Sequence, residues 1–375
     1  MVLFSSTGFK VDSQQNQEKN TLPRAMRKLN ISLLDDTKIS ENELFELYKS
    51  KRRAIRQKKE DIEIQNHIFW TEKPNDANFW ILPNSINEYH KTKKFKRIFN
   101  TALQNALKFN KKTLLFSSGD YGISLPNAKH YIVYRCSGYT SKLKANEKIL
   151  PFFLTDPLSN ISITKKLSPS KVGSFNVPRI GFCGKAPNAT LHHTKELLQV
   201  ILHNLKAFLC FTKLDSQSVV SSSWLRSQIL TAILKNDRLK SDFIIREKYR
   251  AGAVTEYERQ ISTIEYYQNI LNNQFIVCIR GKGNFSVRFY ETLAMGRIPL
   301  FCDTDSPLPE INDSWDKYII RFSPNDIKKL PDIIHQWMDG KDLQQVFKQN
   351  RKLWEEQLSL KGFWINELKR LHDDI

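Results

Sequence analysis

The stretch FIVCIRGKGNFSVRFYETLAMGRIPLFCDTD, residues 275–305, decides the fold of this 375-residue chain. Phe275–Ile279 is an apolar run with the length of a buried strand, and it leads into a loop that contains two glycines. Ser286 can cap a helix that reaches to about Gly296, and Ile298–Cys302 is a second apolar run. A strand, a helix and another strand in this order predict a crossover between parallel strands of one sheet.

The loop and the first turn of this helix have the composition of an anion site. Glycines let the backbone turn sharply and approach a ligand closely, and a helix N-terminus offers unpaired N–H groups and a partial positive charge. Three cationic side chains surround this point, and Glu291, one turn after Arg288, suits the hydroxyls of a ribose. The candidate ligands of a nucleotide diphosphate are therefore Arg280, Gly281, Lys282, Gly283, Ser286, Arg288 and Glu291. The alternative, a surface ion pair between Arg288 and Glu291 beside glycines that only turn the chain, fits the same residues.

Short apolar runs alternate with amphipathic segments over most of the remaining chain, which is typical of an α/β fold with doubly wound parallel sheets. The pattern predicts strands at Phe79–Leu82, Thr113–Ser117, Tyr131–Tyr134, Leu150–Leu154 and Arg179–Cys183, and helices at 95–106, Thr194–Leu209, Leu225–Leu234, 255–271 and within 326–375. Capping boxes at Ser40–Glu43 and Thr255–Glu258 indicate two helix starts. The second of these helices is expected to bury an apolar stripe of Tyr257, Ile261, Ile264 and Leu271.

A break in composition divides the chain. Leu158–Asn176 is rich in Ser, Lys and Asn, as expected of a linker. We therefore expect a polar N-terminal arm over residues 1–40, one α/β domain over 41–165, a second over 177–340, and C-terminal helices over 341–375 that pack across the domains.

Charge and composition narrow the class of function. The chain carries 58 Lys and Arg against 39 Asp and Glu, a net charge of +19, with basic runs at Lys49–Lys59 and Lys91–Arg97. Such a field attracts nucleic acid, anionic lipid or acidic substrates, but no zinc-finger or RNA-binding motif accompanies it. The five cysteines are scattered, which predicts reduced thiols rather than disulfides or zinc ligands. No apolar run has the roughly 18 residues that span a bilayer. Reduced thiols, with no secretory signal at the start of the sequence, predict a cytoplasmic protein.

The segment around the glycine loop resembles the signature of the exostosin-like glycosyltransferases. That family combines an R-G-x-G loop, a helix with the pattern S-x-R-x-x-E-x-L-x-x-G and an I-P-V strand, which correspond here to Arg280–Gly283, Ser286–Gly296 and Ile298–Leu300. About twenty residues agree in order and spacing. Weaker similarities occur at 79–83, at Phe116–Gly122 (FSSGDYG), at 133–151 and at 178–185, whereas the first seventy residues match nothing in the family.

The resemblance implies a GT-B fold, in which two Rossmann-like domains face a cleft. Residues 41–165 would form the acceptor domain, and 177–340 would bind the nucleotide sugar. Arg280, Ser286 and Arg288 would hold the diphosphate and Glu291 the ribose. The chain departs from many relatives at Asp303–Pro309 (DTDSPLP), beside the expected donor cleft, which leaves the sugar open.

The implied reaction is sugar transfer with inversion, and it needs no metal because fixed cations stabilise the leaving diphosphate. An acceptor hydroxyl must lose its proton, and Asp120, after the strand Thr113–Ser117, is the candidate base. The simpler alternative is that Asp120 only caps a glycine-rich turn. His90 and His130 flank this region and are expected to make ordinary hydrogen bonds.

Two further sets of residues have alternative interpretations. Asp303 and Asp305 form an Asp-x-Asp triplet of the kind that binds a divalent ion in other glycosyltransferases, but they follow the donor helix instead of preceding it, so no metal site is expected. Arg226 and Arg246 could line the cleft or form salt bridges.

The sequence thus predicts an inverting, metal-independent glycosyltransferase that moves a sugar from a nucleotide-diphosphate donor, a UDP-sugar, to a glycan or lipid-linked glycan of a surface polysaccharide or glycoconjugate. No cofactor is expected beyond the donor, and a peripheral contact with the anionic inner face of a membrane would suit the charge. The alternatives are a GDP-fucose-dependent fucosyltransferase and a non-catalytic basic protein that binds nucleic acid; the lack of a motif speaks against the latter.

Overall fold

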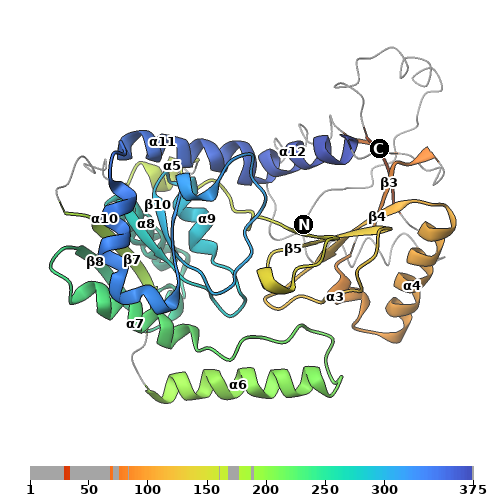
Figure 1. Cartoon of the computed structure of the whole chain (residues 1–375), viewed down its shortest axis with the longest axis horizontal. Helices are drawn as coiled ribbons and strands as arrows, with labels where there is room; N and C mark the ends of the chain where they lie inside the picture. The colour runs from red at the N-terminus through yellow and green to blue at the C-terminus, as the bar shows by residue number, and fades with distance from the viewer. Residues whose placement is uncertain are drawn as a thin grey trace, which may run out of the picture. The chain divides into compact units, whose positions relative to one another are not determined.

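Two β-sheets with their accompanying helices organise the chain, as Figure 1 shows. The computed structural model describes residues 29–33, 68–70, 76–82, 84–159, 161–167, 177–186 and 190–373. The first of two compact units comprises Met1–Phe116, Asn127–Val133 and Leu360–Ile375, and the second comprises Ser117–Pro126 and Tyr134–Ser359. The helix start expected at Ser40–Glu43 and the basic run Lys49–Lys59 lie outside the described residues.

The first sheet has six strands in the order β2-β1-β3-β4-β5-β6, and the pairs β1–β2, β1–β3 and β3–β4 are parallel. Its strands are β1 (Leu29–Leu33), β2 (Ile68–Trp70), β3 (Phe79–Ile81), β4 (Lys112–Ser117), β5 (Tyr131–Arg135) and β6 (Glu147–Ile149). The three strands predicted between residues 79 and 134 are confirmed. β1 lies within residues that the sequence pattern assigned to a polar arm.

The second sheet has five parallel strands in the order β11-β10-β9-β7-β8. They are β7 (Arg179–Lys185), β8 (Lys240–Arg246), β9 (Phe275–Cys278), β10 (Ile298–Cys302) and β11 (Ile320–Phe322). The chain begins at the centre with β7, adds β8 on one side and then crosses to build β9, β10 and β11 on the other. In such sheets ligands bind beyond the carboxyl ends of the strands where the direction of winding reverses, here between β7 and β9.

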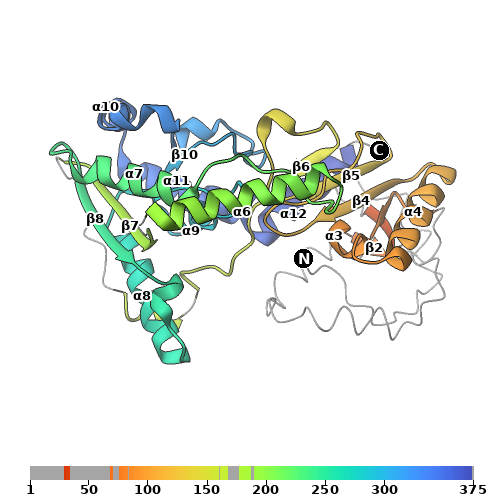
Figure 2. The same cartoon turned by 90° about the horizontal axis from the view of Figure 1, so that it is seen from below.

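Helices cover both faces of the second sheet (Figures 1 and 2), because alternate residues of each strand point to opposite faces. Phe275 and Val277 of β9 belong to a core cluster that also contains apolar side chains of α7 (Ser222–Leu234) and α10 (Leu330–Met338). Ile276 and Cys278 belong to a separate cluster with side chains of α8 (Glu256–Leu271) and α9 (Val287–Ala294). The second unit is therefore a doubly wound α/β structure, as predicted.

The predicted helices in the described part are present. The α-helices not yet named, of which α3 and α5 are short and were not predicted, are α3 (Ile86–Tyr89), α4 (Lys93–Lys108), α5 (Ile161–Thr164), α6 (Thr190–Phe208), α11 (Leu343–Leu353) and α12 (Leu360–Asp373). The capping box that starts α8 is formed by Thr255 and Glu258, as expected, and Asn272 is its C-cap. Within the described residues, no helix is both long and apolar enough to cross a bilayer.

The strand predicted at Leu150–Leu154 is absent, and the pairing ends earlier, with β6 at Ile149. The backbone N–H of Leu150 still donates to the carbonyl of Arg135 at 2.8 Å. Pro151 follows, and because proline has no backbone N–H it stops the ladder in spite of the apolar residues beyond it.

The apolar stripe expected on α8 is only partly buried. Tyr257 and Ile261 are 69% and 49% exposed, whereas Ile270, near the C-terminal end, is fully buried. Asn269 belongs to the same buried turn, where its amide donates to the backbone carbonyl of Asp242 at 2.8 Å. The helix therefore packs on the sheet by its C-terminal half. The spacing of its apolar residues does not predict which half is buried.

Two aliphatic residues of α7 test the core of the second unit. Ile229 has no exposed surface, so Ile229→Ala is expected to leave a cavity and to lower the free energy of unfolding by about 2–5 kcal/mol. Leu234 on the same helix is 58% exposed, and Leu234→Ala should change it by less than about 0.5 kcal/mol. Urea denaturation followed by circular dichroism compares the two; equal midpoints would contradict the assigned packing.

Candidate functional site

Three arginines converge on the reversal point between β7 and β9. Arg288, in the first turn of α9, donates to the carbonyls of Cys183 at 2.8 Å and Val277 at 3.3 Å, one from each strand. Arg280 follows β9 directly and is 4% exposed. Arg226 of α7 donates to the carbonyls of Lys185 and Arg280 at 2.5 and 3.4 Å. The sheet edge at which α/β proteins bind ligands thus carries three positive charges within the second unit.

These arginines form no salt bridge in the described part of the chain, although the charge of Glu291 acts on Arg288 and that of Glu196 on Arg226 without direct contact. The salt bridges of that part include none of the three, and the Nε atom of each is buried without a hydrogen-bond partner there. Burial, with a smaller contribution from the charge of Arg288, lowers the pKa of Arg226 to about 10. Because buried cations without counter-charges are costly, such a cluster is suited to a polyanionic ligand.

Glycines create the room around these side chains. A Cβ at Gly184 would lie 2.7 Å from Nη2 of Arg288, so a side chain there would displace that guanidinium from its present position. A Cβ at Gly283 would lie 2.3 Å from the carbonyl oxygen of Asp120, which brings the GDYG turn directly against the RGKG loop. A Cβ at Gly281 would meet nothing within 4 Å, so the space beside it is open. Lys282 is exposed, with its Nζ 5.7 Å from the ring centre of Tyr121.

Ser286 occupies the N-cap of α9, as predicted, but its side chain makes no capping hydrogen bond. Phe289 and Leu293 are buried on the core side of this helix. The helix ends before Gly296, whose φ of +64° is readily adopted only by glycine.

Glu291 lies one turn into α9 and is held by a residue that the sequence analysis did not identify. Tyr266 of α8 donates its hydroxyl to Oε2 of Glu291 at 2.5 Å. Burial raises the pKa of Tyr266 well above its ordinary value and the charge of Glu291 adds to this, so the phenol stays a proton donor. Arg288 stacks on Phe182, 4.2 Å from its ring centre, and faces backbone carbonyls. The interpretation of Arg288 and Glu291 as a surface ion pair is therefore wrong for Arg288.

Asn284 ties three loops together beside the glycine turn. Its side-chain amide donates to the carbonyls of Gly138, Thr304 and Asp305 at 2.9–3.1 Å, and its Oδ1 accepts from Thr304 and Ser306 hydroxyls. It has no exposed surface. The loops after β5, β9 and β10 are consequently fixed to one another.

The two carboxylates of the Asp303–Asp305 triplet also form hydrogen bonds within these loops. Asp303 pairs with Arg321 at 3.2 Å and accepts from the backbone N–H of Ser306. Asp305 accepts from the backbone N–H and the hydroxyl of Ser141 at 3.0 and 2.5 Å. Within the described residues, no group of three or more His, Cys, Asp and Glu could hold a metal ion.

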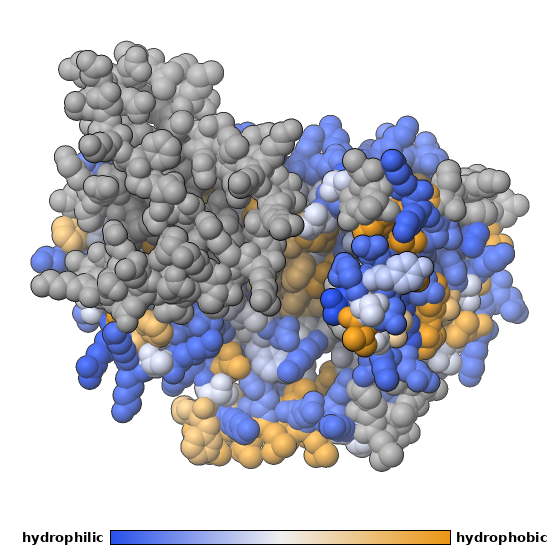
Figure 3. Space-filling model, turned by 180° about the vertical axis from the view of Figure 1, so that it is seen from behind, coloured by the Kyte–Doolittle hydropathy of each residue, from blue (hydrophilic) through white to orange (hydrophobic). Residues whose placement is uncertain are grey.

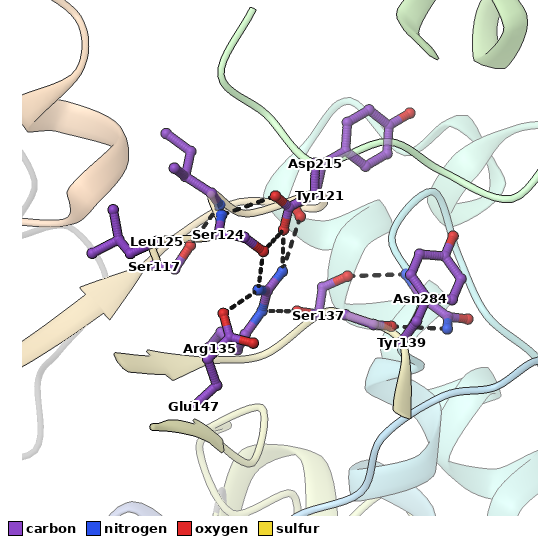
Figure 4. Close-up of polar contacts among 12 residues, drawn as sticks. Ser117, Tyr121, Ser124, Leu125, Arg135, Ser137, Tyr139, Glu147, Asp215 and Asn284 are labelled. Carbon is purple, nitrogen blue, oxygen red and sulfur yellow. Dashed lines mark hydrogen bonds and ion pairs between the residues drawn. The ribbon is translucent and has the colours of Figure 1, made fainter. Parts of the chain in front are cut away.

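Arg135 lies against the GDYG turn, and Figure 4 shows the polar contacts that its guanidinium makes there. Its guanidinium pairs with Glu147 at 2.9 Å and with Asp215 at 2.5 Å, and it donates to the hydroxyl of Ser124 at 3.0 Å. Gly122 has a φ of +72°, and a Cβ there would lie 2.9 Å from Nη2 of Arg135. This buried network fixes the path of the turn that contains the candidate base.

Asp120 is exposed in this turn, and its backbone carbonyl is the group that meets Gly283. The described residues offer no hydrogen bond or ion pair to its carboxylate. The turn and the glycine loop, 160 residues apart in the sequence, are thus brought together in the second unit, while the role of Asp120 as a base stays a prediction.

Tyr139 is a site residue that the sequence analysis did not single out. Its hydroxyl accepts from the backbone N–H of Ser218 at 2.8 Å and from Nη1 of Arg280 at 3.3 Å, and it contacts Oε1 of Gln217 at 3.2 Å. Burial raises the pKa of Tyr139, but the Ser218 hydrogen bonds and the Arg280 charge outweigh it, so the pKa lies below its ordinary value. The phenol donates to Gln217 and accepts from Arg280, and so it orients the Arg280 guanidinium.

The remaining candidates have structural partners. Nδ1 of His90 contacts the carbonyl of Ile86 at 2.8 Å, and His130 packs edge-on against Tyr131. Arg246 forms a salt bridge with Glu265, which is the alternative expected for it. Arg226, in contrast, joins the cationic cluster.

The chain matches no protein-family model, and no curated protein matches it in sequence. Among solved structures, an alpha-glucosyltransferase in complex with UDP and a 13-mer DNA containing an HMU base has a TM-score of 0.32 at 12% identity, over 84% of this chain and 83% of that one. Anabaena Alr3699/HepE in complex with UDP has a TM-score of 0.37 at 10% identity, over 93% of this chain and 100% of that one. TM-scores this low establish neither fold nor function, so both are argued from the residues of this chain.

The glycine loop yields a paired test. Gly283→Ala should lower the free energy of unfolding by about 1–3 kcal/mol, because its methyl group overlaps the carbonyl of Asp120. Gly281→Ala should leave stability unchanged or raise it slightly, since the site is open and alanine restricts the unfolded chain. Thermal unfolding of both variants measures the difference, and equal melting temperatures would show that the GDYG turn does not rest on Gly283.

Proposed function

We propose that this chain is a glycosyltransferase that binds a nucleotide-diphosphate sugar at the reversal point of its second sheet. The observation that carries the proposal is the cluster of Arg226, Arg280 and Arg288, which are buried or half-buried and form no salt bridge among the described residues. A diphosphate supplies the negative charge that this cluster lacks. Glu291, held by Tyr266 on the same helix as Arg288, supplies an acceptor for ribose hydroxyls.

The finer assignment rests on the resemblance of Arg280–Pro299 to the exostosin-like family. It implies a GT-B arrangement, inversion at the sugar, no metal, a UDP-sugar donor and a glycan acceptor. The order of the second sheet, with β7 and β9 flanking the cationic cluster, supports a Rossmann-like donor domain. The open space beside Gly281 supports a close approach of the donor to the backbone.

The proposed reaction is a displacement at the anomeric carbon. The acceptor oxygen forms a bond to this carbon while the bond to the diphosphate oxygen breaks, and the acceptor proton passes to a base. Arg280, oriented by Tyr139, and Arg288 stabilise the negative charge that develops on the leaving diphosphate. Asp120 is the proposed base, because its turn lies against the glycine loop and its carboxylate is exposed.

Nucleotide binding separates this proposal from the alternatives. Saturation with UDP to a hundred times its Kd should stabilise the protein by about 2.7 kcal/mol in a thermal shift assay. Glu291→Gln should weaken UDP binding about tenfold or more, since a neutral amide is a poorer acceptor for ribose hydroxyls. Glu256→Gln, which changes an exposed glutamate of α8, is the matched control and should bind UDP normally.

Other outcomes of that assay identify the alternatives. Stabilisation by GDP rather than UDP would favour the fucosyltransferase alternative. Stabilisation by a DNA duplex alone, weakening steeply as salt is added, would replace the enzyme with a nucleic-acid-binding protein.

The base is tested by release of UDP from UDP-sugars, where water takes the place of the acceptor. Asp120→Asn should lower kcat by roughly 10²–10⁴-fold and leave UDP affinity unchanged. Asp237→Asn, an exposed aspartate of the same unit, should have no effect. Turnover in excess EDTA should equal turnover without it. Full activity of Asp120→Asn would remove this residue from the mechanism, and loss of activity in EDTA would overturn metal independence.

A further inference from the structure

Helix α6 exposes a continuous apolar face. Six side chains along it are between 47% and 84% exposed: Leu198, Ile201, Leu202, Leu205, Phe208 and Leu209. Their spacing of three, four and seven residues places them on one side of the helix. Figure 3 shows hydrophobic side chains gathered along its lower edge, the edge at which Figure 1 draws α6, and in Figure 2 the drawn helices and strands of the second unit lie behind α6.

The polar face of α6 points inward and is fixed there. Asn204 exchanges two hydrogen bonds of 2.7 Å with the backbone of Gln217, and Nε2 of His203 contacts the carbonyl of Asp215 at 3.0 Å. Glu196 accepts from the hydroxyls of Ser221 and Ser223. A surface helix normally buries its apolar face, so this orientation is inverted and is held by specific contacts.

The charges around this face have one sign. Lys195, Lys206 and Lys213 are exposed along it, and Phe211, just beyond the helix, is 79% exposed. Glu196 is the one acidic residue between 190 and 213, and it is engaged on the inward side. The chain as a whole carries a net charge of +19.

We propose that α6 docks this protein on an anionic lipid membrane, lying in the plane of the interface. Leucine and phenylalanine on one face with lysines beside them are the composition of interfacial helices, and the lysines add attraction to acidic headgroups. A second copy of the chain is a poorer occupant, because face-to-face pairing would bring the lysines of both copies together without an acid to offset them. The inference is independent of the proposed glycosyl transfer.

Vesicle binding tests the docking surface on the full chain. We expect the protein to float with vesicles of phosphatidylcholine and phosphatidylglycerol, and to float less with phosphatidylcholine alone. Ile201→Asp should weaken this partitioning about tenfold or more, because a charge replaces an inserted side chain. Ile261→Asp is the matched control: Ile261 is 49% exposed on α8, against 47% for Ile201, and this change should not weaken binding.

The contribution of the lysine charges and the insertion of α6 into the membrane are measured separately. Lys206→Glu should weaken binding, whereas Lys328→Glu, the same change at an exposed site of the second unit, should weaken it less. Cys210, the exposed cysteine among the five, can carry an environment-sensitive dye whose emission should shift to the blue on anionic vesicles only.

Two results would overturn the proposal. One is equal vesicle binding by wild type, Ile201→Asp and Ile261→Asp. The other is a dimer in analytical ultracentrifugation that Ile201→Asp converts to a monomer, together with no vesicle binding by the wild type. UDP binding by the same variants is measured alongside, so failure of the membrane proposal and failure of the donor site are distinguished.

Discussion

The candidate site of the second unit depends on holding three guanidinium groups, buried or half-buried, at one edge of a sheet without a salt bridge to any described carboxylate. Backbone carbonyls at the ends of β7 and β9 partly offset the charge of Arg288, and the face of Phe182 covers it. Gly184 is small for the same reason. These adaptations keep the cations in place but do not neutralise them, and this separates the cluster from an ordinary structural ion pair.

Networks of hydrogen bonds and ion pairs, each centred on one residue, hold the loops around the cluster in place of apolar packing. Asn284 uses its amide nitrogen and oxygen on partners in two other loops, and Arg135 uses its guanidinium on Glu147, Asp215 and Ser124. Networks of this kind specify one arrangement, because a buried polar group that loses its partner is costly. Loops at the carboxyl edge of an α/β sheet would otherwise be its least ordered part.

Local patterns predicted the elements of this site well. The apolar runs of β9 and β10 and the capping residue of α9 lie within the quoted segment, and the structure reproduces their order and nearly their bounds. The sequence could not show that Asn284 meets Gly138, 146 residues away, or that Tyr139 orients Arg280 across 141 residues. Likewise β1 has polar flanks and is recognisable only through its pairing with β2 and β3. Such roles arise from tertiary neighbours, which periodicity does not encode.

A cationic cluster of this strength has a consequence for turnover under the proposed function. The same guanidinium groups that stabilise the leaving diphosphate also bind the spent nucleotide, which carries more negative charge after the sugar has left. Release of the nucleotide, rather than glycosyl transfer itself, would then be the rate-limiting step of turnover. The rate of such an enzyme would respond to the cellular ratio of nucleotide sugar to free nucleotide diphosphate, and so to the energy supply of the cell.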